Sequence, residues 1–482
     1  MHDLRKKALL ESGKTMSRKS QAKTSRSGIS SAATESPASS RPGSRTNSRA
    51  PSRANSQPNS RYASEDDDDD ADEYGNEDGL GYYDSENTQT STESGSDIEN
   101  DPDWVDRIES RIDELQDRKR QLSQREEDLY QYCRLIRHHY ASVALKSDIH
   151  NISSALLRGI RSGGSTTERS LALEALTLTM LNCPSGTIFS QVSSALKFAS
   201  KDGEEDMIKT SAIRALSIAM LYEGSKDDAE SVLEFLLDII ESDGHVVDAP
   251  DNGKVVTAAL RAWAFVATQM DDLESLSDRA MEAFMDQLDS TDPSVQMSAG
   301  TNIALLFEAA RDSEEETGES SSLQHEQYRI MTRMGEIVRS HSKRVSRKDR
   351  RQLRSKFNSI ITSLELGKGP GYSTASTQLS NPHTGGGSET RGGAAEELGY
   401  RTKIRIHNMY LIIDSWSLLA RVETIKPILG NGFHIHFLEN PVIRDLLGTA
   451  QVEYLASSSW KNKPKQNQEP KRGKKPNERF IF

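Results

Sequence analysis

The residues of this sequence best suited to chemistry are basic side chains that gather in two short stretches. In the first, seven of the twelve residues from 343 to 354 are lysine or arginine, and a helical pattern continues from there to Leu364. Guanidinium and ammonium groups at this density favour contact with the phosphates of a nucleic acid. A nuclear-localisation signal and a solvated helix face are the alternatives. The basic residues concerned are Lys343, Arg344, Arg347, Lys348, Arg350, Arg351 and Arg354.

The second basic stretch lies within Trp460–Phe482, which holds eight basic residues and two acidic ones. Three prolines, at 464, 470 and 476, prevent a continuous helix because proline has no amide donor and clashes with the preceding turn. We expect an extended, disordered arm that threads into an RNA groove and stacks its aromatic tip on bases; a solubilising tail is the alternative. The RNA-binding candidates here are Lys461, Lys463, Lys465, Lys471, Arg472, Lys474, Lys475, Arg479, Phe480 and Phe482.

The N-terminal region is divided by charge. Met1–Arg61 is rich in serine and arginine, and Glu65–Asp103 holds seventeen acids and no basic residue. We expect residues 1–103 to be disordered. Within them an arginine precedes a serine by three residues four times in succession, a pattern that suits kinases with basic specificity. The alternative is a solvated tail whose bias in composition is not recognised by any partner. The phosphorylation candidates are Ser44, Ser48, Ser52 and Ser56.

Other residue patterns with chemical potential are weak. His434 and His436 lack further ligands for zinc, and His138 and His139 are adjacent on a predicted helix, so both pairs are interpreted as structural or surface histidines. The acidic run lacks the glycine turn and ligand spacing of a calcium loop. No nucleophile, base and orienting acid occur at usable spacing. We therefore expect no cofactor, no metal and no enzymatic activity.

A helical repeat must position the basic stretches. The segment Thr291–Asp312 begins with a capping aspartate and a proline and continues with apolar residues at helical spacing. Similar segments occur at Arg169–Leu181, Thr210–Leu221 and Val256–Met270, and the spacings between copies are 40, 47 and 38 residues. Such spacings are typical of stacked helical pairs of the HEAT or armadillo kind. An ordinary helical bundle is the alternative.

Each copy is followed by a second helical segment that would complete its pair. These segments are 185–200, 227–242, 276–289 and 323–340, and a loop at Asp243–Gly253 explains the longest spacing. Trp104–Gln124 is predicted as a leading helix, and Arg311–Ser322 as an acidic insertion. The helical-repeat domain thus spans residues 104–340, and a basic helix follows at 341–366.

The remaining chain predicts a linker and a small C-terminal α+β domain. Residues 367–400 are rich in glycine, serine and threonine, and 450–482 form the basic tail. In the domain at 401–449, two strands meet near His407, a helix covers Leu418–Leu429, a third strand is expected at Phe433–Phe437, and a last helix follows. Because about fifty residues form a small core, we expect this unit to pack on the end of the solenoid.

Composition agrees with a mainly α protein that carries long disordered tails. The hydrophobic fraction is 34%, the mean hydropathy is −0.68 and the formal net charge is −12. Only Cys133 and Cys183 are present, which favours a reducing compartment over a disulfide-bonded secreted protein. No apolar run is long enough to span a membrane, and we expect a soluble intracellular protein without membrane partners.

Three stretches, in this order, resemble one family, the interferon-related developmental regulators. They are Asp292–Arg311 with its run ALLFE at 304–308, the basic stretch KDRRQLRSKF at 348–357, and MYLIIDSW at 409–416 followed by LGNG at 429–432. The resemblance covers most of Arg125–Leu447. It implies an armadillo-like helical domain, a small C-terminal domain and no enzyme activity.

The resemblance also implies two activities. Members of the family bind translationally inactive ribosomes, where a basic C-terminal segment occupies RNA-lined channels, or act in the nucleus as transcriptional co-regulators through protein contacts. The basic stretch of the family is matched in this chain at Lys348, Arg350, Arg351 and Arg354. The terminal arm resembles the family's C-terminal segment only in charge and in its last aromatic residue. The chain departs from the family pattern in the prolines of its arm and in Pro427, which interrupts a helix that is unbroken in other members.

We therefore expect a non-enzymatic ribosome-binding and RNA-binding regulator of translation that associates with inactive ribosomes in the cytoplasm. The alternative is a nuclear transcriptional co-regulator that serves as a helical-repeat scaffold, with chromatin or transcription regulators as its partners. In both cases kinases are the expected partners of the N-terminal tail.

Overall fold

A computed structural model gives the fold of this 482-residue chain. The phosphorylation candidates Ser44, Ser48, Ser52 and Ser56, the basic arm 461–482, Lys343 and Arg344 lie outside the residues that it describes, and so do nearly all of the tails expected to be disordered. The described residues are 102–203, 205–222, 226–270, 272–318, 323, 326–339, 346–374, 397–406, 409–448 and 450–454.

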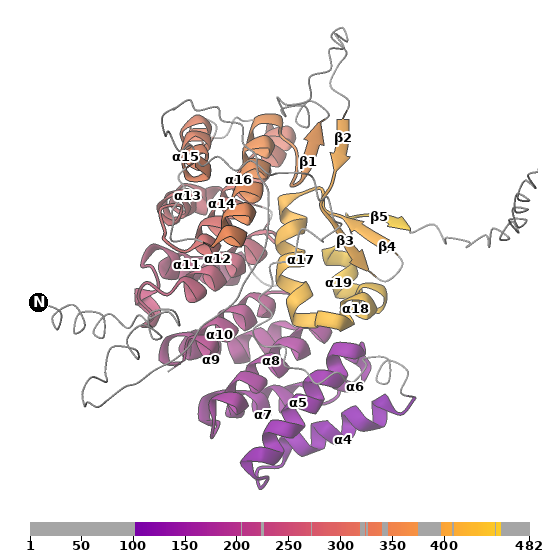
Figure 1. The fold of residues 1–482 in the computed structure, drawn as a ribbon. Coiled ribbons are helices and arrows are strands. Elements are labelled where there is room, and N and C mark those ends of the chain that lie inside the picture. The colour runs from indigo at the N-terminus through magenta and orange to yellow at the C-terminus, as the bar shows by residue number, and fades with distance from the viewer. Residues whose placement is uncertain are drawn as a thin grey trace, which may run out of the picture. The chain divides into compact units, whose positions relative to one another are not determined.

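Two rows of stacked helices form the main body and confirm the predicted solenoid (Figure 1). Successive helices of the first row contact one another, and each helix of the second row packs against the first-row helix that follows it in the chain. The first row consists of α5 (Leu122–His138), α8 (Thr166–Asn182), α10 (Asp206–Ala219), α12 (Gly253–Ala267), α14 (Pro293–Thr317) and α16 (Arg347–Leu366). The second consists of α7 (Ile149–Ser162), α9 (Gly186–Asp202), α11 (Lys226–Glu241), α13 (Glu274–Gln287) and α15 (Gln327–Arg339).

Helix α14 shows how the repeat sequence produces this stack. Asp292 caps the helix by accepting a hydrogen bond from the amide of Ser294 at 2.7 Å, and Pro293 occupies the first turn. Val295, Ile303 and Leu306 are buried as their helical spacing predicts. The helix continues as far as Thr317, so most of the segment predicted as an acidic insertion is helical. Glutamate has a high helix propensity, which accounts for the added turns.

Polar side chains join neighbouring repeats within the buried first row. The side-chain amide of Asn302 donates to the carbonyl of Leu260 at 2.9 Å, and the Tyr132 and Thr179 hydroxyls share a hydrogen bond of 2.9 Å. An unpaired buried polar group costs free energy, and each of these bonds is available in one register of the stack. These bonds therefore fix how each helix lies against the next.

The longest spacing between repeats has the predicted cause, a loop after α11. The loop holds the short helix η1 (His245–Val247) and turns through Gly244, whose φ is +84°. A Cβ atom at Gly244 would lie 2.2 Å from the carbonyl oxygen of Ala249, so only glycine fits. Lys209 donates to the carbonyl of Asp248 at 2.9 Å and to that of Val247, and thereby holds the loop against α10.

The first helices differ from prediction. The leading helix expected at Trp104–Gln124 is divided into α4 (Trp104–Gln116) and the beginning of α5 at Leu122, with the short α6 (Ser142–Lys146) after α5. The division allows Arg120, between the two helices, to pair with Glu114 at 2.9 Å and with Asp128 at 3.2 Å. If α4 and α5 were one continuous helix, Arg120 would not be placed to pair with both carboxylates.

The C-terminal part contains two small sheets and three helices. The predicted strands near His407 are confirmed as β3 (Lys403–Ile406) and β4 (Met409–Ile412), which pair antiparallel. The third strand of this sheet is β5 (Gln451–Tyr454), which begins just beyond the predicted domain limit of 449. The helices are α17 (Trp416–Leu429), α18 (Phe433–Glu439) and α19 (Pro441–Leu446), and the turn η4 (Gly430–Gly432) precedes α18.

The strand predicted at Phe433–Phe437 is wrong, because these residues form helix α18. Phe433 and His436 are the buried residues, three positions apart, whereas Ile435 and Phe437 are half-buried. The alternation of Phe433, Ile435 and Phe437 imitated a strand, but burial follows the helical period. Pro427 does not interrupt α17: the helix continues past it to Leu429, although the proline lacks the amide that would bond to the carbonyl of Glu423.

The predicted linker 367–400 also contains structure at both of its ends. Strand β1 (Tyr372–Thr374) pairs antiparallel with β2 (Glu397–Tyr400), and the rings of Tyr372 and Tyr400 lie 5.4 Å apart edge to face. Residues 375–396 are outside the described part. Among the described residues, no helix is long and apolar enough to cross a membrane.

The repeat register can be tested at Leu306, which is 2% exposed in α14. We expect Leu306→Ala to lower the free energy of unfolding by about 2 to 5 kcal/mol, since it removes buried contacts and leaves a cavity. Urea denaturation measures this change. Val143→Ala is the control because Val143 is 91% exposed. Equal effects of the two substitutions would contradict the burial of Leu306 in the stack.

Candidate nucleic-acid interface

Helix α16 carries the described part of the first basic stretch, and Ser346 fixes its beginning. The Ser346 hydroxyl accepts a hydrogen bond from the amide of Asp349 at 3.1 Å and donates to the Asp349 carboxylate at 2.7 Å. This cap satisfies an amide that would otherwise lack a partner at the helix start. The first basic residue, Arg347, therefore lies in the first turn of a well-defined helix.

The two faces of α16 differ in chemistry. Its buried face carries residues at helical spacing, whereas the basic residues lie outside. Arg350 is half-buried and forms the border between the two faces. The buried residues are Leu353, Phe357, Ile360, Ser363 and Leu364. The exposed basic residues are Arg347, Lys348, Arg351 and Arg354.

A glycine in α14 determines how closely α16 approaches the stack. A Cβ atom at Gly300 would lie 2.6 Å from Cε1 of Phe357 and 3.0 Å from Cδ1 of Ile360. The small residues at 299 and 300 thus admit a neighbouring helix, as the sequence predicts. Because this contact commits one face of α16 to the core, the basic residues are held on the opposite, solvent-facing side.

The C-terminal end of the basic stretch is joined to α17. The Lys356 ammonium lies 3.3 Å from the Glu423 carboxylate and 5.4 Å from the ring centre of Trp416. The indole of Trp416 donates to the Ser363 hydroxyl at 2.7 Å. Lys356 therefore binds the protein itself, and its charge belongs to the packing of α16 rather than to the exposed basic face.

Glu308 connects two of the motifs that the sequence singles out. It ends the run ALLFE in α14, and its carboxylate accepts hydrogen bonds from the amides of Trp416 at 2.7 Å and Ser417 at 2.8 Å. These amides begin α17, so the negative charge lies at the positive end of a helix dipole. Burial raises the pKa of the Glu308 carboxyl, while the two amide bonds act in the opposite direction.

Arg421 fastens the middle of α17 to the end of α12. Its guanidinium donates to the carbonyl of Thr268 at 2.5 Å, to the Thr268 hydroxyl at 3.2 Å and to the carbonyl of Leu446 at 3.0 Å. Burial lowers the pKa of Arg421, and the charge of Glu308 partly offsets this. The arginine satisfies carbonyl groups at the C-terminal ends of α12 and α19, where a cation is favoured.

The turn after α17 lies against α5. A Cβ atom at Gly432 would be 1.8 Å from the carbonyl oxygen of Arg137, which explains why the motif LGNG has glycine here. His436 shares a hydrogen bond of 3.0 Å with the carbonyl of Ile136, and the Asn440 side chain donates to the carbonyl of Leu181 at 3.0 Å. The unit α17–α19 therefore lies along the first row, against α5, α8, α12 and α14, and not on the solenoid's end as expected.

The histidines have structural surroundings. Burial lowers the pKa of His436 to about 4, so its ring is neutral at pH 7 and its Nε2 donates to the Ile136 carbonyl. His434 is half-buried and bonds to the carbonyl of Asn431, and the His139 ring stacks on Trp104 with centroids 4.6 Å apart. Within the described part of the chain, no three His, Cys, Asp or Glu side chains are placed to hold a metal ion.

The structure thus brings together four of the predicted RNA-binding residues, Arg347, Lys348, Arg351 and Arg354, on one helix. It separates Arg350, which is half-buried at their border. Sequence reasoning missed Glu308 and Arg421, which hold the neighbouring α17 in place. The only signal for Glu308 was its position in a run shared with a family, and Arg421 gave none.

A family model described as interferon-related developmental regulator matches residues 81–365. An uncharacterised protein of Schizosaccharomyces pombe is 24% identical over 360 residues, which cover 72% of this chain and 74% of that protein.

Two vertebrate relatives match a shorter region. Interferon-related developmental regulator 2 of Mus musculus is 26% identical over 209 residues, and interferon-related developmental regulator 1 of Sus scrofa is 24% identical over 209 residues. These matches cover 43% of this chain but only 40% and 38% of the two relatives. An engineered protein of known structure shares 16% identity over 53% of this chain and 97% of its own, with a TM-score of 0.33, which is too low to bear on the fold.

The role of Glu308 can be tested by the pH dependence of stability. A carboxyl whose folded pKa is raised contributes most below its unfolded pKa, and the contribution is lost as pH rises through the folded pKa. Glu308→Gln does not titrate and offers one oxygen to two amides. We therefore expect a loss of about 1 to 3 kcal/mol near pH 4 that shrinks towards pH 8.

Denaturant unfolding of both proteins at a series of pH values measures this difference. The control is Glu316→Gln, an exposed position on the same helix, which should leave stability nearly constant at every pH. A loss that grows with pH would mean that the fold stabilises the ionised carboxylate, contrary to the raised pKa.

Proposed function

Because the chain belongs to the interferon-related developmental regulator family, we propose that it is a non-enzymatic regulator of translation that binds RNA of inactive ribosomes through α16. The observation that supports this most is the row of exposed basic side chains Arg347, Lys348, Arg351 and Arg354 on one helix. RNA phosphates are repelled by a protein of net charge −12 except where basic residues concentrate. The exposed face of α16 is such a place.

The geometry of α16 favours a phosphate backbone over an isolated anion. Arg347, Arg351 and Arg354 follow one another at intervals of four and three residues, so their side chains project from one side of the helix over about 10 Å. Several phosphates along a strand can be contacted at once, and each contact releases counterions. Because Gly300 and Phe357 fix α16 on the stack, this row is presented without a change in fold.

The basic arm at 461–482 would extend the RNA contact beyond the body of the protein. Twenty-three residues from Trp460 extend up to about 75 Å, enough for an arm to follow an RNA-lined channel away from the body. Eight basic residues supply charge, and Phe480 and Phe482 supply rings for stacking on bases. The arm and α16 would then bind the same ribosome at separate places.

The alternative function is nuclear. The vertebrate relatives are named as developmental regulators. A helical stack with a basic segment also suits a transcriptional co-regulator that enters the nucleus through this segment and binds other proteins. Sedimentation of a cell lysate through a sucrose gradient separates the two proposals. Co-migration with monosomes supports the ribosomal function, and a nuclear pool without ribosomes supports the alternative.

Charge reversal on α16 tests the RNA contact. We expect Arg347→Glu, Lys348→Glu and Arg351→Glu together to weaken RNA binding and to reduce the slope of log affinity against log salt by about 2, because three phosphate contacts are lost. Filter binding of ribosomal RNA at several salt concentrations measures both quantities.

The matched control reverses three exposed lysines elsewhere, Lys119, Lys146 and Lys254, with the same change in net charge. This control should retain most of the affinity and a steeper salt slope. Equal losses in both variants would mean that net charge, and not α16, governs binding. An unchanged affinity together with lost nuclear import would assign the basic stretch to localisation.

Deletion of Lys461–Phe482 tests the arm. We expect the melting temperature to stay the same and the inhibition of translation in a cell extract to be relieved, since the arm acts by charge and reach rather than by packing. Equal inhibition by the truncated and intact proteins would place the activity in the body of the protein.

A further inference from the structure

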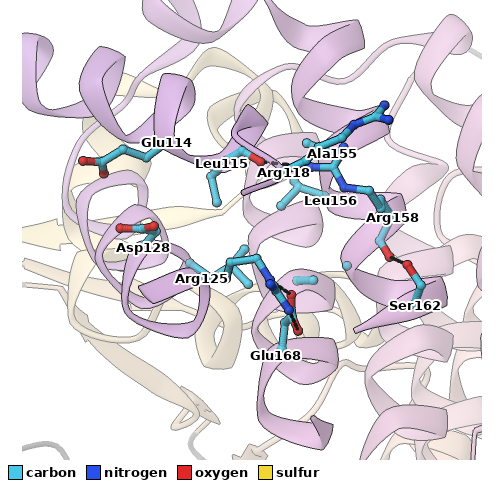
Figure 2. A pocket seen from close by; sticks show the side chains of 13 residues that line it. Glu114, Leu115, Arg118, Arg125, Asp128, Ala155, Leu156, Arg158, Ser162 and Glu168 are labelled. Atoms are coloured by element: carbon cyan, nitrogen blue, oxygen red, sulfur yellow. Dashed lines mark hydrogen bonds and ion pairs between the residues drawn. The ribbon is translucent and has the colours of Figure 1, made fainter. Parts of the chain in front are cut away.

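A cavity of about 230 Å³ lies at the beginning of the solenoid, between α4, α5, α7 and α8 (Figure 2). Its apolar wall includes Leu115, Ala155 and Leu156, and its polar wall is formed by charged side chains. None of its lining residues is aromatic. The cavity is far along the chain from the basic stretch of α16.

The acidic residues of this cavity are already matched by arginines. Arg111 and Arg120 lie 3.0 Å and 3.2 Å from the Asp128 carboxylate, and Arg120 lies 2.9 Å from that of Glu114. Glu168 accepts two hydrogen bonds from Arg125, at 2.6 Å and 3.0 Å. A two-pronged pair of this kind is a strong interaction, and it neutralises Glu168. Figure 2 shows the Arg125–Glu168 pair apart from Glu114 and Asp128.

Three further arginines remain without an acidic partner among the described residues. Arg118 is exposed in the α4–α5 connection, Arg161 is exposed in the last turn of α7, and Arg158 is half-buried between them. Arg158 donates one hydrogen bond, to the carbonyl of Leu115 at 3.3 Å. Burial is the main cause that lowers the pKa of Arg158, and the positive charges of Arg118 and Arg125 lower it further. The site thus holds positive charge that its own carboxylates do not balance.

A second hollow continues from the first across Arg158. It has a volume of about 370 Å³, and its walls also include Ser154, Arg161, Ser162 and Gln191. The Gln191 side-chain amide donates to the Ser154 hydroxyl at 2.9 Å, and both residues line this hollow.

We propose that these two hollows bind a phosphorylated peptide, in which Arg118, Arg158 and Arg161 take the phosphate of a phosphoserine. Clustered guanidinium groups are the usual recognition element for phosphoserine, since each can bond two phosphate oxygens. The apolar wall at Ala155 and Leu156 suits the short stem of the serine side chain. Neighbouring residues of an extended peptide occupy the second hollow.

RNA is the less suitable occupant. Single-stranded RNA is held by stacking on aromatic side chains as well as by charge, and the residues that line both hollows include no aromatic ring.

The experiment compares two degenerate nonapeptide libraries, one with a central phosphoserine and one with a central serine, by fluorescence anisotropy on the full chain. We expect the phosphorylated library to bind at least about tenfold more tightly. Arg118→Gln with Arg161→Gln should remove this preference, and neither substitution breaks a described ion pair. The control, Lys146→Gln with Lys254→Gln, removes the same charge elsewhere and should bind as the parent protein does. Thermal melting verifies that all variants are folded.

A second arm separates the source of the phosphate. Free phosphoserine should bind several-fold more weakly than the phosphopeptide library, because only the peptide has neighbouring residues to occupy the second hollow. Free phosphoserine that binds as tightly as the peptide would overturn the peptide proposal. Equal affinity for both libraries, or an arginine variant that retains the preference, would overturn the site itself.

A third arm separates the site from α16. The variant with Arg347, Lys348 and Arg351 reversed should keep its full affinity for the phosphopeptide library, whatever happens to RNA binding. Competition by an RNA oligonucleotide that is lost on substitution of Arg118 and Arg161 would assign the hollows to RNA and overturn the proposal.

Discussion

The Glu308 carboxylate joins two parts of the chain that are 108 residues apart, by accepting the amides of Trp416 and Ser417. The position of the C-terminal helices depends on these two hydrogen bonds. It begins α17 at a defined point on α14, and from there Arg421 reaches the end of α12, while the turn at Gly432 reaches α5. A helix of fourteen residues thereby bridges several repeats of the first row. Repeats otherwise contact only their neighbours, so α17 makes the stability of several repeats cooperative over a longer distance.

The same packing determines which charges face the solvent. Helix α16 is held from one side by Gly300 and from another by α17, where Trp416 bonds to Ser363 and Lys356 pairs with Glu423. The exposed arginines lie in the N-terminal half of α16, away from these contacts with α17. The basic face is therefore a consequence of how α16 closes the stack, in addition to being a feature of its sequence.

Periodicity predicted the helices well because each repeat buries a stripe that is visible in the local sequence. Leu306 and Leu216 are buried where the helical period places them. Local patterns failed where short segments are ambiguous: Phe433, Ile435 and Phe437 alternate like a strand, yet contacts of His436 with α5 and of Asn440 with α8 favour a helix. The exposed face of α16 was predictable from composition. Its anchoring was not, because the bonds of Glu308 and Arg421 join residues whose separation no local pattern reveals.

The arginines beside the first hollow and those of α16 lie at the two ends of the stack, and the nature of a solenoid explains why. An inner helix such as α12 is covered by neighbours on both sides, and a buried guanidinium there must find acceptors, as Arg421 does at Thr268. A terminal helix has one neighbour fewer. At the beginning, α4 and α5 leave the hollow beside Arg158; at the other end, α16 is the last helix of the first row among the described residues. Exposed charge costs little at these ends because water is near. The ends of the row are consequently the places where this chain can present arginine to a phosphate, whether that phosphate belongs to a nucleic acid or to a peptide.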